Sequence, residues 1–282
     1  GGVHSEFTIA KETDDSFYLV SAGAFQRLDH DWIKKWMPND RSVTFENLTN
    51  SIGVLVVAGP KARELLSKIS NADFSNKAFP WLSAQKIDVG LAPSIAMRMN
   101  FVGELGWELH HPIEYQNHIF DRLMEAGDEL GVKPFGMRAM DSLRIEKTYK
   151  LVGTEMSIEY AAYESGLDRF VHLNKGNFIG RDALVKWQQD GFDNKMVTLE
   201  VFDINDADAL GNNAVYSDGK VIGRATGGNY GFRVKKSLAI AMVKPKYSKV
   251  GTELEMDILD QKHKVVVIED SPYDPTNDKI KA

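Results

Sequence analysis

The chain has 282 residues, of which 43% are hydrophobic and 26% charged, a composition typical of a globular protein with one large or two modest domains. The net charge of −6 argues against a nucleic-acid-binding surface, and the absence of cysteine excludes disulfides, thiolate nucleophiles and Cys-ligated zinc. No apolar run approaches the roughly 20 residues that span a bilayer, and the first residues lack signal-peptide features, so we expect a soluble chain without a membrane partner.

The first half of the chain alternates predicted strands and helices. Residues 7–20 fit a β-hairpin around a polar turn. Leu28, Trp32 and Trp36 recur at helical spacing and predict a helix over residues 26–37. Further elements are expected in this order: a strand over 54–58, a helix through 65–69, a strand over 95–101, a helix ending near 131 and a helix over 138–147.

The pattern changes to mostly β after a predicted helix over residues 181–189. Alternating apolar residues and the turn sequence at 217–220 predict a small antiparallel barrel or sandwich. We therefore expect an α+β fold with one domain over residues 1–192 and a C-terminal β-barrel domain over residues 193–282. The polar residues 271–282 are expected to form a loose tail.

The stretch Asn100–Leu109 contains the most informative group of polar residues. Two glycines at 103 and 106 bend the chain, and they place Glu104 and Glu108 next to a predicted strand. A carboxylate at such a position accepts two parallel N–H bonds from an amidine-like edge, such as that of a pterin. The alternative is a β-turn with two solvated glutamates, which spacing alone favours.

Residues 136–155 form a second candidate group. Asp141 and Arg144 stand three apart on a predicted helix, and this spacing by itself favours a surface ion pair. Arg138, near the helix start, is a candidate for binding a ligand carboxylate because its planar guanidinium donates two parallel bonds.

Three weaker patterns are interpreted structurally. Adjacent strand residues His110 and His111 face opposite ways without a third ligand, so we expect no metal. The glycine-rich residues 227–231 lack a following helix, which favours a bulge or tight turn over a phosphate loop. Ser5, His4 and Glu6 are sequence neighbours, an arrangement that rarely builds a catalytic triad.

Several motifs in the same order resemble one family. They are VAGPKAR at 57–63, GELGWEL at 103–109, LRIEK at 143–147, LNKGNFIGRDAL at 173–184 and KSLAIAMV at 236–243. Together they resemble the folate-binding module in the C-terminal half of dimethylglycine and sarcosine dehydrogenases and, more distantly, the glycine-cleavage T-protein. The resemblance runs from Gly1 to about Ile268.

The resemblance implies a tetrahydrofolate-binding aminomethyltransferase domain followed by a small β-barrel. The implied reaction is the capture of a one-carbon unit by folate N5, from a methylated amine such as dimethylglycine or sarcosine, to give 5,10-methylenetetrahydrofolate. A flavin-dependent dehydrogenase domain or subunit is the implied partner, and this chain, which lacks a dinucleotide fingerprint, is expected to bind no flavin itself. The implied compartment is the cytoplasm, or the mitochondrial matrix in a eukaryote.

The resemblance also assigns site residues. Glu108 matches the family's pterin-holding glutamate, and Glu6 matches the key aspartate that T-proteins carry. Phe101, Glu104, Arg138 and Tyr149 complete the implied folate site.

Three departures separate the chain from T-proteins. Glu6 is one methylene longer than the aspartate, and Met140 replaces an arginine that binds the glutamate tail of folate. Phe101 replaces a tyrosine, so the stacking face remains but a hydroxyl is lost. Two alternatives therefore stay open: a folate-binding module without catalysis, and a folate-dependent demethylase of another small substrate.

The chain begins in the middle of the family's folate-binding domain. Family modules have a substantial stretch before the position of Gly1. We expect the domain to be incomplete at its N-terminus, with the remaining strands in a longer parent protein or a partner, and with an exposed sheet edge at the cut.

Overall fold

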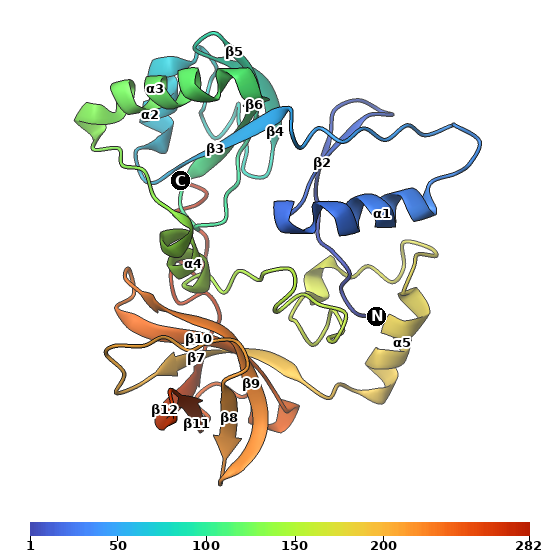
Figure 1. The fold of residues 1–282 in the computed structure, drawn as a ribbon, viewed down its shortest axis with the longest axis vertical. Helices are drawn as coiled ribbons and strands as arrows, with labels where there is room; N and C mark the ends of the chain where they lie inside the picture. Colours follow the sequence, from blue (N-terminus) through green and yellow to red (C-terminus); the bar gives the residue numbers. More distant parts are fainter. The chain divides into compact units, whose positions relative to one another are not determined.

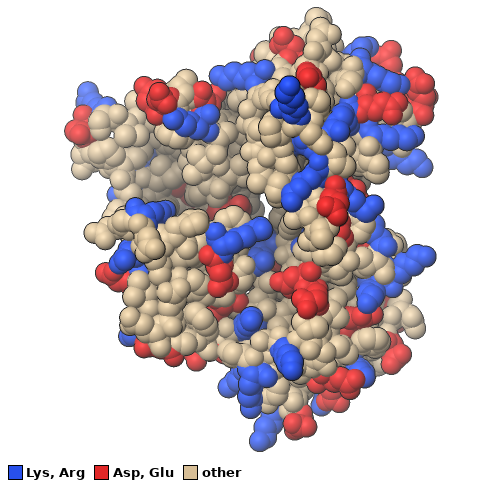
Figure 2. All heavy atoms as spheres, turned by 180° about the vertical axis from the view of Figure 1, so that it is seen from behind, with Lys and Arg blue, Asp and Glu red and all other residues tan.

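The computed structural model describes residues 1–282, which pack into two compact units (Figure 1). The sheet unit comprises residues 7–136 and 276–282, and the barrel unit comprises residues 1–6 and 137–275. Acidic and basic side chains are interspersed over the face of the molecule in Figure 2. None of the helices combines the length and apolar character needed to cross a membrane.

The sheet unit is built on a four-stranded antiparallel sheet with strand order β3-β6-β5-β4 and a separate two-stranded hairpin, β1-β2. Its elements are β1 (Thr8–Lys11), β2 (Phe17–Val20), α1 (Gln26–Trp36), β3 (Ile52–Ala58), α2 (Ala62–Ile69), β4 (Ala84–Val89), β5 (Ala92–Met97), β6 (Gly106–Pro112) and α3 (Gln116–Gly127). The predicted hairpin and the predicted helices of this region are confirmed. The strand predicted over 95–101 ends earlier, at Met97.

The two faces of this sheet differ because successive side chains point to opposite sides of a strand. Trp107 and Leu109 of β6 are fully buried in the core that contains α2 and α3, and both helices lie on this side of the sheet (Figure 1). Glu108 and His110 therefore belong to the other face, which we call the open face. The hairpin residue Tyr18 contacts His110 on this open face.

The barrel unit carries a closed six-stranded antiparallel barrel in the order β10-β7-β12-β11-β8-β9. Its elements are α4 (Met137–Ile145), α5 (Arg181–Asp190), β7 (Lys195–Val201), β8 (Ala214–Ser217), β9 (Lys220–Gly231), β10 (Lys236–Val243), β11 (Glu253–Ile258) and β12 (Gln261–Ile268). Asp218 and Gly219 join β8 to β9 with φ of 49° and 72°, the left-handed geometry that a tight hairpin requires. The predicted barrel and its hairpin turn are confirmed.

The glycine-rich residues 227–231 form the end of β9 rather than a turn. The predicted bulge lies at their start, because the register shifts between Ala225 and Gly227. A Cβ atom on Gly228 would lie 2.8 Å from the carbonyl oxygen of Leu238, and one on Gly231 would lie 2.9 Å from Cγ of Glu146. These glycines therefore permit close packing against β10 and against the residues that follow α4.

The prediction of a loose tail over residues 271–282 is wrong. In the barrel unit, the amide of Tyr273 donates to the carbonyl of Glu146 at 3.0 Å. In the sheet unit, Ile280 is 3% exposed, and the Arg98 guanidinium donates to the carbonyl of Ala282 at 2.9 Å. The polar composition of this segment was misleading. The segment is held by one buried apolar side chain and by hydrogen bonds to backbone carbonyls, not by an apolar run.

Candidate functional site

The bend between β5 and β6 is organised by Asn100, which the sequence analysis did not single out. The Asn100 side-chain oxygen accepts hydrogen bonds from the amides of Val102 and Gly103, both at 3.0 Å, and its Nδ2 donates to the carbonyl of Glu104 at 2.8 Å. Asparagine commonly closes turns in this way, and this preference is the signal that could have identified it. The bend positions the candidate residues Phe101 and Glu104, both of which are half-buried.

The two glycines of the bend have separate structural roles. Gly103 has a φ of 71°, which favours glycine because it has no Cβ. Gly106 starts β6 beside β3, where a Cβ would lie 2.5 Å from the carbonyl oxygen of Val57. The bend therefore brings the chain into β6 in the register that sends Glu108 to the open face.

Glu108 lies on the open face with its side chain 19% exposed. Its Oε2 lies 3.3 Å from His110 Nε2, and the ring Nδ1 of His110 lies 3.1 Å from the Tyr18 hydroxyl. Glu108 stands opposite Val56 in the register of β3 and β6, and Val56 is 39% exposed. The result is a carboxylate held from one side and flanked by an accessible apolar side chain.

The two adjacent histidines bond to protein groups on opposite faces of the sheet. His111 Nδ1 lies 3.0 Å from the carbonyl of Leu109, and its Nε2 lies 2.9 Å from Gln116 Oε1, at the start of α3. His110 makes the open-face contacts described above. The pairing of His110 with Tyr18 was missed because nothing in the sequence connects residues that are 92 positions apart.

The remaining predicted site residues belong to the barrel unit. Glu6 is exposed and ends the segment Gly1–Glu6, which the amide of Val3 anchors to the carbonyl of Ser157 at 2.9 Å. Arg138 is exposed in the first turn of α4, and Tyr149 is half-buried beyond its end. Burial raises the pKa of the Tyr149 hydroxyl above its usual value near 10. The six predicted residues are thus divided between the units, with Phe101, Glu104 and Glu108 in the sheet unit.

The interpretation of Asp141 and Arg144 as a surface ion pair is wrong. Arg144 is 3% exposed, and it bonds to Asp141 at 2.7 Å, to the carbonyl of Tyr149 at 3.0 Å and to Glu155 at 3.4 Å. Glu155 is itself fully buried and accepts a further bond from Thr226 of β9. The spacing rule failed because it describes an isolated helix, whereas α4 packs against the barrel.

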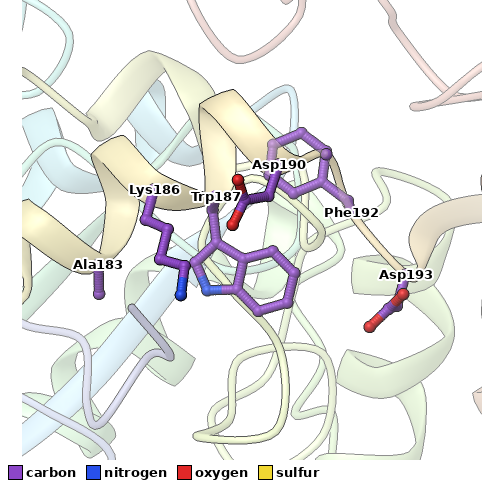
Figure 3. Close-up of a pocket in the computed structure, with 7 residues that line it drawn as sticks. Ala183, Lys186, Trp187, Asp190, Phe192 and Asp193 are labelled. Carbon is purple, nitrogen blue, oxygen red and sulfur yellow. The ribbon is translucent and has the colours of Figure 1, made fainter.

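Two cavities lie within single units. One, of about 450 Å³, borders the open face of the sheet unit and is lined in part by Tyr18, Lys86 and His110. The other, of about 420 Å³, lies at the C-terminal end of α5 (Figure 3). Its Trp187 and Phe192 rings stack with centroids 6.0 Å apart, and Lys186 and Asp190 of α5 lie beside Trp187 in Figure 3. No predicted site residue lines this second cavity.

Comparison with known families supports the assignment made from the motifs. Residues 1–175 match the family model described as the GCVT N-terminal domain, and residues 194–274 match the glycine cleavage T-protein C-terminal barrel domain. The chain belongs to the glycine cleavage T-protein family. Over 97% of its length and 73% of theirs, it is 32% identical to the aminomethyltransferase of Thermoanaerobacter sp. (strain X514).

The chain also matches dehydrogenases. The chain is 35% identical to mitochondrial dimethylglycine dehydrogenase of Homo sapiens over 99% of its own length, but it spans only 33% of that protein. This chain thus spans about a third of the length of the dimethylglycine dehydrogenases that it matches.

The fold is also shared with a solved structure. The glycine cleavage system aminomethyltransferase T from Bartonella henselae superposes with a TM-score of 0.83 at 21% identity, over 97% of this chain and 73% of that one. The predicted T-protein-like fold with a C-terminal barrel is therefore confirmed.

Proposed function

We propose that this chain binds tetrahydrofolate and transfers a one-carbon unit to it from a methylated amine such as dimethylglycine or sarcosine. The observation that carries the proposal is Glu108, a half-buried carboxylate on the open face with Val56 beside it. A flat pterin ring presents an apolar face and an N–H-rich edge. A carboxylate beside an apolar side chain suits both features at once.

Each predicted residue has a role in this proposal. Glu108 accepts two N–H bonds from the pterin edge, Phe101 packs against the ring, and Glu104 borders the same bend. Tyr149 contributes to folate binding, and Arg138 binds the carboxylates of the glutamate tail in place of the arginine that Met140 has replaced. In this proposal the folate-binding domain takes in residues 1–192, and residues 193–282 supply the barrel.

Glu6 is proposed as the catalytic acid–base group. The residue is exposed. When bound, tetrahydrofolate supplies the N5 amine that accepts the one-carbon unit. Glu6 assists by holding and moving a proton during this transfer, a task that suits a carboxylate placed at the reacting atoms.

The donor and partner are proposed from the relatives. The human dimethylglycine dehydrogenase is about three times as long as the part that matches this chain, since the match covers 33% of that protein. We propose that a flavin-dependent dehydrogenase, as a domain or a subunit, produces the one-carbon unit and that this chain itself binds no flavin. The proposed compartment is the cytoplasm, or the mitochondrial matrix in a eukaryote, as in the name of the human relative.

Anaerobic calorimetric titration of the purified chain with tetrahydrofolate tests the proposal. We expect saturable binding in the wild type and a loss of at least roughly 100-fold in affinity for Glu108→Ala, because two charge-assisted bonds of about 1.5 kcal/mol each are removed. Glu114→Ala, an exposed glutamate after the end of β6, is the matched control and should bind normally. Unchanged affinity in Glu108→Ala would remove Glu108 from the site.

Product analysis then distinguishes the type of reaction. The protein is incubated with tetrahydrofolate and the methylated amine in the presence of a flavin-dependent amine dehydrogenase. Methylenetetrahydrofolate supports the proposed transfer, and its loss in Glu6→Gln supports the role of Glu6. Methyltetrahydrofolate would instead indicate a demethylase, and binding without any product would indicate a non-catalytic module.

A further inference from the structure

His110 is a buried polar residue whose contacts have no role in the proposed reaction so far. Its side chain is 1% exposed, although it lies on the open face of the sheet. Both ring nitrogens have partners: Nδ1 lies 3.1 Å from the Tyr18 hydroxyl, and Nε2 lies 3.3 Å from Glu108 Oε2. The Tyr18 and His110 rings also meet edge to face, with centroids 5.5 Å apart. A continuous chain of contacts thus leads from the hairpin to the Glu108 carboxylate.

For a neutral His110, electrostatics selects one arrangement of protons among Tyr18, His110 and Glu108. A neutral imidazole carries hydrogen on only one nitrogen, and the other nitrogen presents a lone pair. A lone pair on Nε2 would face the negative Glu108 oxygen and repel it, so the hydrogen belongs on Nε2. Nδ1 must then accept, which requires the Tyr18 hydroxyl to donate. Burial raises the pKa of that hydroxyl, as do the nearby carboxylates of Glu12 and Glu108, so it keeps its proton at neutral pH.

We propose that His110 and Tyr18 are positioning residues for folate recognition: Tyr18 fixes the His110 tautomer, and the Nε2–H of His110 holds the Glu108 carboxylate in the orientation that receives the ligand. The inference rests on the proposed function of Glu108. Neither residue touches the folate in this scheme.

The physical advantage of this arrangement is preorganisation. A glutamate has three rotatable side-chain bonds, and ordering such a side chain on binding reduces affinity. His110 restricts one carboxylate oxygen before the ligand arrives, while the exposed part of the group remains open to it. Supporting hydrogen bonds of this type commonly determine whether a site is held tightly enough to work.

A double-mutant cycle in tetrahydrofolate affinity tests the coupling. His110→Leu replaces the donor with an apolar side chain, and we expect roughly a tenfold loss of affinity. In the Glu108→Ala background the same change should have less than about a twofold effect, because the acceptor that His110 holds is already absent. A purely structural role would give the same loss in both backgrounds and would overturn the proposal.

The neighbouring His111→Leu variant is the matched control. It also removes a buried, doubly hydrogen-bonded histidine, but from the face that packs against α3. We expect it to reduce stability and leave folate affinity unchanged. An equal loss of affinity in His110→Leu and His111→Leu would show that general damage to β6 is responsible.

A second set of measurements does not depend on the folding of His110→Leu. Nitrogen-15 NMR of the ligand-free wild type should show His110 as the tautomer protonated at Nε2 alone. Tyr18→Phe, which removes only a hydroxyl, should increase the Nδ1-protonated form and weaken tetrahydrofolate binding about threefold. A proton on Nδ1 in the wild type, or unchanged affinity in Tyr18→Phe, would contradict the proposed arrangement.

The outcomes for the two proposals are separable. A folded wild type that does not bind tetrahydrofolate contradicts the proposed function. Binding that requires Glu108 but is insensitive to His110 contradicts only the positioning role.

Discussion

The buried glutamates of the barrel unit and Glu108 of the sheet unit show two uses of the same side chain. Glu146 is fully buried, and its carboxylate accepts bonds from the Arg233 side chain and from the Arg233 amide at 2.6 Å. Glu108 keeps 19% of its side chain exposed and is held by the ring of His110. A carboxylate surrounded by donors of its own fold is structural, whereas one held from a single side is available to a ligand.

The comparison predicts a large loss of stability for one of these glutamates and a small one for the other. Glu146→Ala leaves the Arg233 guanidinium without its carboxylate partner, and removal of one member of a buried ion pair costs about 3–5 kcal/mol. Glu108→Ala removes a single hydrogen bond at a partly exposed position and should cost about 1 kcal/mol or less. Urea unfolding followed by circular dichroism measures both values. Equal losses would break the distinction between structural and ligand-binding glutamates.

The close packing of β9 against β10 predicts a difference between two neighbouring glycines. Gly228→Ala places a Cβ 2.8 Å from the Leu238 carbonyl oxygen, and such overpacking costs about 1–3 kcal/mol because backbone must shift. Gly227→Ala meets only Arg144 Nη2 at 3.6 Å, an ordinary contact, and should be tolerated. Thermal unfolding of the two variants measures the difference. A stable Gly228→Ala variant would mean that β9 and β10 are less tightly packed than the structure indicates.

A smaller effect is expected from the tyrosines of the two units at alkaline pH. Burial raises the pKa of Tyr18 and of Tyr149 above the usual value near 10. Above pH 10 the unfolded chain releases these protons before the folded chain does, so the free energy of unfolding falls as pH rises toward the folded-state pKa values. Below pH 10 the contribution is fully present.

Unfolding measured between pH 8 and about pH 11 tests this effect. Tyr18→Phe and Tyr149→Phe should each make the fall in stability shallower, while Phe101→Leu, which titrates nothing, should leave its slope unchanged. An unaltered slope in Tyr18→Phe would show that its hydroxyl is not shielded on the open face.

The regular elements were predictable because each depends on nearby residues. The apolar spacing of Leu28, Trp32 and Trp36 gave α1, and the sequence Ser217-Asp218-Gly219-Lys220 gave the turn between β8 and β9. The strand predicted over 95–101 was too long because hydrophobic alternation continues to Phe101, whereas the Asn100 side chain captures the backbone amides and ends the sheet pairing.

The candidate site was predictable only in part. The motif that contains Glu108 was one of several that identified the family through their order, and the alternation of strand side chains predicted that His110 and His111 face opposite ways. Their partner Tyr18 lies 92 residues before His110, and no local pattern connects the two.

The sequence by itself determined the family, most of the helices and the presence of a C-terminal barrel, because periodicity and turn chemistry are local. The tertiary structure alone decided which charged residues are structural and which are available. Arg144 and Glu108 both look like surface residues in the sequence, but long-range packing surrounds the first with carboxylates and carbonyls and leaves the second open on one side. Burial and partner geometry arise only when distant segments meet, so spacing along the chain does not contain them.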